Sequence, residues 1–135
     1  MITAVDTNVL LDVLLQDPTF ALPSEETLRG ASNEGALVIC EIVYAELAGL
    51  FPRPGDLEVF LRETGIRLNP SRPETLWKAG ELWRQFCLGR KRSQEGSRRI
   101  LADFLIGAHA LLQSERLLTR DKNFYRSAFS DLPVI

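Results

Sequence analysis

Four short apolar segments, each followed by a longer segment of helical pattern, limit the folds that this chain of 135 residues can adopt. Strands that alternate with crossover helices pair in parallel, and helices then cover both faces of the sheet. The sequence therefore predicts an α/β fold, a three-layer arrangement in which a central, mostly parallel sheet of about five strands is flanked by helices.

The predicted elements follow from apolar runs, helical periodicity and the positions of glycine and proline. The predicted strands are 2–5, 36–40, 66–69, 116–119 and 132–135, the last at a sheet edge, where Pro133 is tolerated. The predicted helices are 9–15, capped by Thr7 or Asn8, then 25–33, 41–50, 56–63, capped by Asp56, then 71–87, 101–112 and a short one within 120–124.

Composition and length are those of one ordinary globular domain spanning residues 1–135, with 45% hydrophobic and 25% charged residues. The first apolar run has no basic segment before it, and Asp6 and Asp12 interrupt it. Such a run is unsuited to a signal peptide or a membrane span. We therefore expect a cytoplasmic protein that does not bind membranes.

The chain has one histidine and two cysteines, too few for most sites built from these residues. His109 is the only histidine, which argues against a histidine-based zinc site and against a Ser-His-Asp triad. Cys40 and Cys87 lie in apolar segments without metal-ligand spacing, so we interpret both as small buried side chains in a reducing compartment. Any metal would have to be bound by oxygen ligands.

One carboxylate, Asp103, lies in the middle of the otherwise apolar predicted helix 101–112. Moving an ionised carboxylate out of water without a partner costs roughly several kcal/mol of free energy. A buried Asp103 must therefore be paired, neutralised or bound to a cation. Arg99 lies four residues earlier on the same helix face and offers a simple ion pair. Gly107, one turn later, would instead leave open space for a hydrated cation or a substrate.

Three further carboxylates are candidates for the same site. Asp6 and Asp121 directly follow predicted strands, and Glu46 lies in the helix after the second strand. In a parallel sheet these positions meet outside the carboxyl ends of the strands. Four carboxylates in one crevice repel one another unless divalent cations lie among them, and oxygen ligands favour Mg²⁺ or Mn²⁺. Simpler interpretations remain for single residues: Asp6 as a helix cap and Glu46 as a solvated surface residue.

Charge is distributed unevenly along the chain. Residues 1–83 contain 6 Lys and Arg against 13 Asp and Glu, a net charge of −7, whereas residues 84–135 contain 10 against 5, a net charge of +5. A basic face can bind phosphates, although a charge run is more often only a solvated loop. The candidate phosphate-binding residues are Arg90, Lys91, Arg92, Arg99 and Arg120.

Four motifs together resemble the PIN-domain ribonucleases, and most closely the VapC-type toxins of toxin-antitoxin pairs. The motifs are Val5-Asp-Thr-Asn-Val-Leu-Leu11, Ile42-Val-Tyr-Ala-Glu-Leu47, Asp103-Phe-Leu-Ile-Gly-Ala-His-Ala110 and Leu118-Thr-Arg-Asp-Lys-Asn-Phe124, and they extend over essentially the whole chain.

The resemblance implies a PIN fold and Mg²⁺- or Mn²⁺-dependent hydrolysis of single-stranded or loop RNA. It places the acidic metal-site residues at Asp6, Glu46, Asp103 and Asp121, with Asn8 and Thr119 as polar supports. It also implies a small antitoxin partner, and we expect a homodimer. The chain departs from the family at Cys40, where Ser or Thr often begins the helix.

Three other functions are compatible with parts of the pattern. A PIN nuclease of RNA processing or decay would share the chemistry without toxicity. A receiver-like Mg²⁺-binding signalling module also places acids at strand ends, but this chain has Thr119-Arg120-Asp121 where a receiver has a lysine. A haloacid-dehalogenase phosphatase needs a second aspartate two residues after the first, and Asn8 occupies that position.

Overall fold

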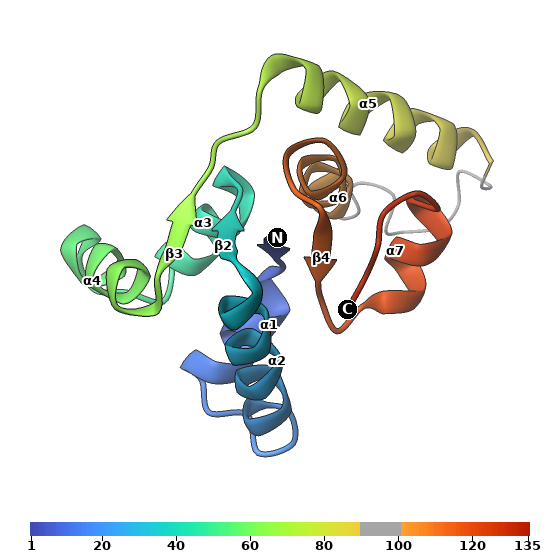
Figure 1. Cartoon of the computed structure of the whole chain (residues 1–135). Coiled ribbons are helices and arrows are strands. Elements are labelled where there is room, and N and C mark those ends of the chain that lie inside the picture. Colours follow the sequence, from blue (N-terminus) through green and yellow to red (C-terminus); the bar gives the residue numbers. More distant parts are fainter. Residues whose placement is uncertain (90–100) are drawn as a thin grey trace.

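The computed structural model describes residues 1–89 and 101–135 of the chain (Figure 1). Its elements are β1 (Ile2–Val5), α1 (Thr7–Leu14), α2 (Ala21–Glu34), β2 (Ala36–Ile39), α3 (Glu41–Ala48), α4 (Pro54–Thr64), β3 (Ile66–Leu68), α5 (Pro73–Leu88), α6 (Leu101–Gln113), β4 (Arg116–Leu118) and α7 (Lys122–Ala128). The predicted alternation of strands and helices is thus confirmed.

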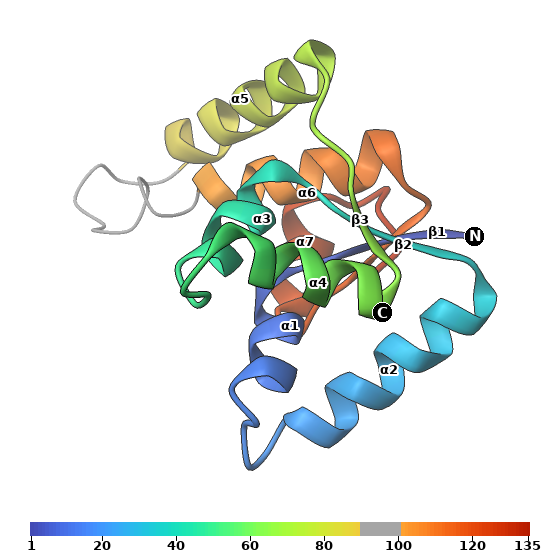
Figure 2. The same ribbon diagram turned by 90° about the vertical axis from the view of Figure 1, so that its left-hand side faces the viewer.

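The sheet is parallel throughout, with strand order β3-β2-β1-β4. Figures 1 and 2 show helices on both sides of it, α5 and α6 on one side and α1 and α2 on the other. The predicted α/β sandwich is therefore confirmed. Among the described residues, no helix has both the length and the apolar character needed to cross a membrane.

Within residues 1–89 and 101–135 the sheet has four strands, so the prediction of about five is wrong. The segment 132–135 does lie beside β4, but it forms only an isolated bridge between Leu117 and Val134. Its backbone exchanges two hydrogen bonds with β4, from Leu117 N to Pro133 O and from Ile135 N to Leu117 O, and Ile135 O accepts a third from Thr119 N just after the strand. Pro133 has no N–H to extend this ladder.

Helix starts differ most from the predictions. Helix α2 begins at Ala21 rather than at residue 25, because Pro23 lies in its first turn, where proline is tolerated, and not in a loop. Asp6, not Thr7 or Asn8, caps α1 by accepting a hydrogen bond from Thr7 N. Helix α4 begins at Pro54 after Arg53, so Asp56 lies in its first turn and is not its cap.

The predicted open space beside Gly107 does not exist. A Cβ atom at this position would lie 2.3 Å from Cε2 of Phe129, so the glycine is needed to admit the Phe129 ring. That ring also packs on Phe104 and Tyr125 in an aromatic cluster that joins α6 to α7. Gly107 therefore serves packing between helices, and any room beside Asp103 has another origin.

We expect Gly107→Ala to destabilise the protein by about 2 kcal/mol, the usual cost of one extra methyl group in a packed core, although alanine is the better helix former. The matched control is Gly80→Ala in α5, where nothing lies within 4 Å of the added Cβ. This control should be neutral or stabilising. Urea unfolding of both variants measures the difference, and equal stabilities would contradict the packing role of Gly107.

Candidate active site

Parallel pairing of β1 with β4 brings together the residues that follow the two strands. Val5 is in register with Leu118, and Asp6 N donates to Leu118 O over 2.9 Å. Asp6 and Thr119 consequently lie side by side at the carboxyl edge of the sheet, although 113 positions separate them in the sequence. This is the edge at which the sequence predicted a ligand site.

Asp6 is held by three hydrogen-bond donors and is only 5% exposed. Its Oδ1 accepts from Thr7 N at 2.7 Å, and its Oδ2 accepts from Thr119 Oγ1 at 2.7 Å and from Asn8 Nδ2 at 3.3 Å. Burial raises the pKa of Asp6, as does the nearby charge of Glu46, while the hydrogen bonds from Thr119 and Thr7 act in the opposite direction. Asp6 is thus both a helix cap and part of an acidic cluster.

Asn8 and Thr119, the two polar residues that the resemblance named, both donate hydrogen bonds to Asp6. Asn8 Nδ2 also lies 3.3 Å from Thr119 Oγ1, and Thr119 Oγ1 accepts from Asp121 N at 3.0 Å. Thr119 therefore connects the end of β1 with the first residues before α7. These contacts fix the orientation of the Asp6 carboxylate and the position of the Asp121 backbone.

Glu46 is exposed on α3, but it is not an independent surface residue. Its Oε1 accepts a hydrogen bond from Thr7 Oγ1 over 2.9 Å, and its charge acts on both Asp6 and Asp103. Sequence reasoning treated Thr7 only as a possible cap and missed this contact. A hydroxyl directly after Asp6, at the start of a helix, was the available signal.

Asp103 has no hydrogen-bond or ion-pair partner in residues 1–89 and 101–135. It is half-buried at the start of α6. Burial, followed by repulsion from Asp6, Asp121 and Glu46, raises its pKa to about 6. The four predicted carboxylates are therefore close enough to act on one another electrostatically.

The donors in this cluster suit a hard divalent cation. No three His, Cys, Asp or Glu side chains of the described segments are close enough to enclose an ion between them. Mg²⁺ does not require such a cage, because it is usually held by one or two carboxylates together with water and substrate phosphate. The fully buried Tyr125 hydroxyl lies beside Asp6, and its polar contact with the carboxylate lowers the pKa of Asp6.

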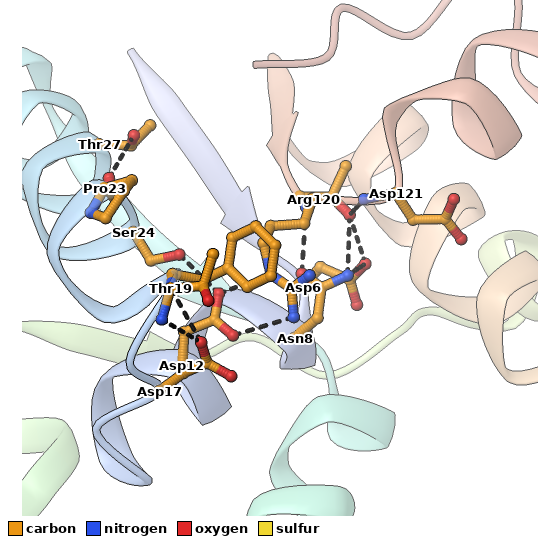
Figure 3. Close-up of polar contacts among 12 residues, drawn as sticks. Asp6, Asn8, Asp12, Asp17, Thr19, Pro23, Ser24, Thr27, Arg120 and Asp121 are labelled. Atoms are coloured by element: carbon orange, nitrogen blue, oxygen red, sulfur yellow. Dashed lines mark hydrogen bonds and ion pairs between the residues drawn. The ribbon is translucent and has the colours of Figure 1, made fainter.

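Most of the predicted phosphate-binding residues, Arg90, Lys91, Arg92 and Arg99, lie outside the described residues. The two predicted contacts of Arg99, an ion pair with Asp103 and binding of a substrate phosphate, therefore also fall outside the described residues. Arg120 is described, and its guanidinium is bound to Asp12 (Figure 3). Phosphate binding by Arg120 stays a prediction, and its observed partner is a carboxylate of α1.

His109 and Cys40 are buried, and neither contacts the acidic cluster through a hydrogen bond in the described residues. His109 is 1% exposed, its Nε2 lies 2.7 Å from Asn69 O, and burial lowers its pKa. Cys40 precedes α3 without any side-chain capping bond, as its departure from Ser or Thr suggested. Burial raises the pKa of Cys40 to about 11, so the thiol is unreactive near neutral pH.

Comparison with protein families decides the assignment, since the model for the PIN domain matches residues 3–130. The chain belongs to the PIN family. This PIN domain is similar in structure to the VapBC2 complex of Rickettsia felis bound to a DNA fragment from its promoter, with 19% identity, a TM-score of 0.67, and coverage of 100% of this chain and 98% of the other.

It is also similar to VapBC-1 of nontypeable Haemophilus influenzae, with 19% identity, a TM-score of 0.69, and coverage of 100% and 97%. At this identity the likeness shows that the fold is shared. A search of curated protein sequences gives no match.

Proposed function

We propose that this PIN domain is a Mg²⁺- or Mn²⁺-dependent endoribonuclease that acts as the toxin of a toxin-antitoxin pair. The observation that carries the proposal is the cluster of Asp6, Glu46, Asp103 and Asp121 at the carboxyl edge of the sheet, where mutual repulsion and burial raise the pKa of Asp103 to about 6. The chain belongs to the PIN family, the two similar structures contain VapBC2 and VapBC-1, and the sequence motifs resemble VapC-type toxins with ribonuclease activity.

In this mechanism one or two of the four carboxylates would bind the cation directly, together with water and substrate phosphate, and the others would lie around it. Asp6 is fixed by three donors and Glu46 by Thr7, so both are preorganised. Asp103 has no donor in the described segments and is free to turn toward an incoming cation. A bound divalent cation supplies polarisation of the scissile phosphate and a lowered pKa for a water nucleophile.

The chain's own residues also arrange the polar surroundings. Thr119 and Asn8 donate to Asp6 Oδ2, and Thr119 also accepts from Asp121 N, so the backbone of Asp121 is fixed beside Asp6. The basic residues 90–92 and 99 are proposed to bind RNA phosphates, which sets affinity and its salt dependence but not sequence preference.

The direct test incubates the purified protein with a mixed cellular RNA and maps the ends produced. Cleavage is expected with Mg²⁺ or Mn²⁺, is expected to stop with EDTA, and should return when the metal is added again. Sequencing both new ends gives the cleavage position and the end chemistry together. Absence of any cut with either metal, or full cleavage in EDTA, would contradict the proposal.

Toxicity separates this proposal from a PIN nuclease of RNA processing or decay. We expect expression of the chain to arrest growth, and co-expression of a small protein from the neighbouring reading frame to relieve the arrest. Cleavage without growth arrest would favour the processing nuclease. The receiver-like alternative would require acyl-phosphate formation from a small phosphodonor and no RNA cleavage, and membership of the PIN family gives it no support.

Homodimerisation is also proposed, because several large apolar side chains on the helices, among them Leu22, Trp77 and Leu88, are exposed. Sedimentation at several protein concentrations measures it directly. A mass that stays at 15.2 kDa at all concentrations would exclude the dimer.

A further inference from the structure

The turn between β4 and α7 is tied to α1 by an ion pair between Arg120 and Asp12 (Figure 3). Arg120 Nε lies 2.6 Å from Asp12 Oδ2, and Nη2 lies 2.9 Å from Oδ1. Two parallel bonds of this kind fix direction as well as distance. The Asp12 side chain is only 3% exposed, and its Oδ2 also accepts from Ser24 Oγ at 2.7 Å.

The guanidinium is held by an aromatic ring as well. Arg120 Cζ lies 4.0 Å from the centre of the Phe20 ring, within range of a cation–π contact. Phe20 is placed by Asp17, whose Oδ1 accepts hydrogen bonds from the backbone N–H groups of Thr19 and Phe20 at 2.8 and 2.9 Å. Arg120 therefore has one position that Asp12 and Phe20 determine together.

The backbone of Arg120 continues this chain of contacts into the active site. Arg120 N donates to Asn8 Oδ1 over 3.2 Å. With its oxygen held in this way, the Asn8 amide presents Nδ2 to Asp6 Oδ2 and to Thr119 Oγ1. Arg120 also lies between Thr119 and Asp121 in the sequence. One residue thus connects a buried carboxylate outside the site with two proposed metal ligands.

We propose that Arg120 is a positioning residue, anchored by Asp12, that holds the turn of Thr119 and Asp121 and the amide of Asn8 in the arrangement needed for cation binding. This inference rests on the proposed function. It differs from phosphate binding by Arg120, because the Nε–Nη2 edge of the guanidinium binds Asp12 and the charge of the arginine is balanced there.

The test compares Asp12→Asn with Arg120→Lys. Asp12 is buried and reaches no RNA, while lysine keeps the positive charge at 120 and loses the fork. Each variant is expected to weaken Mn²⁺ binding, measured by calorimetry without RNA, by about 10- to 100-fold, the usual effect of removing an outer partner of a metal ligand. We expect kcat to fall with little change in KM, and the double variant to be no worse than either single variant, because both remove one interaction.

The matched controls are Asp56→Asn and Arg53→Gln, which remove the exposed ion pair at the start of α4. These variants should retain the Mn²⁺ affinity and the activity of the wild type. Circular dichroism at the assay temperature verifies that all variants are folded. The proposal would be overturned if Asp12→Asn kept its Mn²⁺ affinity while Arg120→Gln showed the loss of a phosphate contact. That loss would appear as a higher KM and as a slope of log K against log salt concentration, for RNA binding, that is smaller by about one.

A measurement on the metal-free protein keeps this inference separate from the proposed function. The Arg120 amide proton, bonded to Asn8 Oδ1, is expected to exchange slowly with solvent in the wild type and at least 10-fold faster in Asp12→Asn. Failure of the wild type to bind Mn²⁺ or cut RNA would defeat the proposed function. Equal exchange rates in wild type and variant would defeat the positioning role, whatever the activity.

Discussion

Asp6→Asn is expected to lower the rate of RNA cleavage by at least about 1,000-fold, equivalent to about 4 kcal/mol of transition-state stabilisation, while the fold is retained. Asp6 is buried and fixed by three donors, so it is the proposed ligand with the least freedom to be replaced by a neighbour. An amide binds Mg²⁺ far less strongly than a carboxylate, because it carries no charge.

The variant should remain folded for a local reason. Asparagine caps helices as well as aspartate does, so its Oδ1 can still accept from Thr7 N. The loss of one charge also relieves the repulsion on Asp103. Cleavage is measured as initial rates with Mn²⁺, and Asp56→Asn on α4 is the matched control. Undiminished cleavage by a folded Asp6→Asn protein would remove the proposed mechanism.

The sheet and the four-carboxylate cluster were predictable from the sequence because they depend on short-range patterns and on one topological rule. Asp6 follows β1 and Asp121 follows β4 by three residues, and parallel strands bring these positions to one edge. Glu46 and Asp103 were predicted less directly, from helices next to that edge. Their mutual influence appears only in the assembled structure.

Contacts between distant side chains could not be predicted in the same way. The space beside Gly107 is filled by Phe129, 22 positions later, and Arg120 binds the carboxylate of Asp12, 108 positions earlier. The sequence shows a glycine beside an acid and an arginine in a basic segment, and both patterns also fit open space and phosphate binding. Only the packing of the folded chain distinguishes these alternatives, because it fixes the direction of each side chain.

Asp103→Asn is expected to stabilise the metal-free protein at pH 7.5, although it removes a proposed catalytic residue. The pKa of Asp103 is raised to about 6 in the folded protein from an ordinary value of 3.8. The folded state therefore holds the proton more tightly than the unfolded chain, and this contribution to stability is lost as pH rises from about 4 to about 6. The free energy of unfolding of Asp103→Asn is expected to exceed that of the wild type by about 1 to 3 kcal/mol, nearer the lower value because the side chain is only half-buried.

Urea unfolding in EDTA at pH 7.5 and pH 4.5 measures this effect. The variant should be more stable than the wild type at pH 7.5, and the difference should shrink at pH 4.5, where Asp103 of the wild type is largely protonated. Asp56→Asn should show no such pH-dependent gain. Equal stabilities of Asp103→Asn and wild type at pH 7.5 would mean that repulsion within the cluster is already relieved without metal.

Adding Mn²⁺ should reverse the order of stability. A cation that binds only the folded state stabilises the protein according to its concentration relative to Kd, and the wild type should gain more than Asp103→Asn because it keeps all four carboxylates. The same repulsion that weakens the metal-free fold then becomes attraction for the cation. A gain of equal size in both proteins would exclude Asp103 as a ligand, and the half-buried charge in α6 would then need another partner.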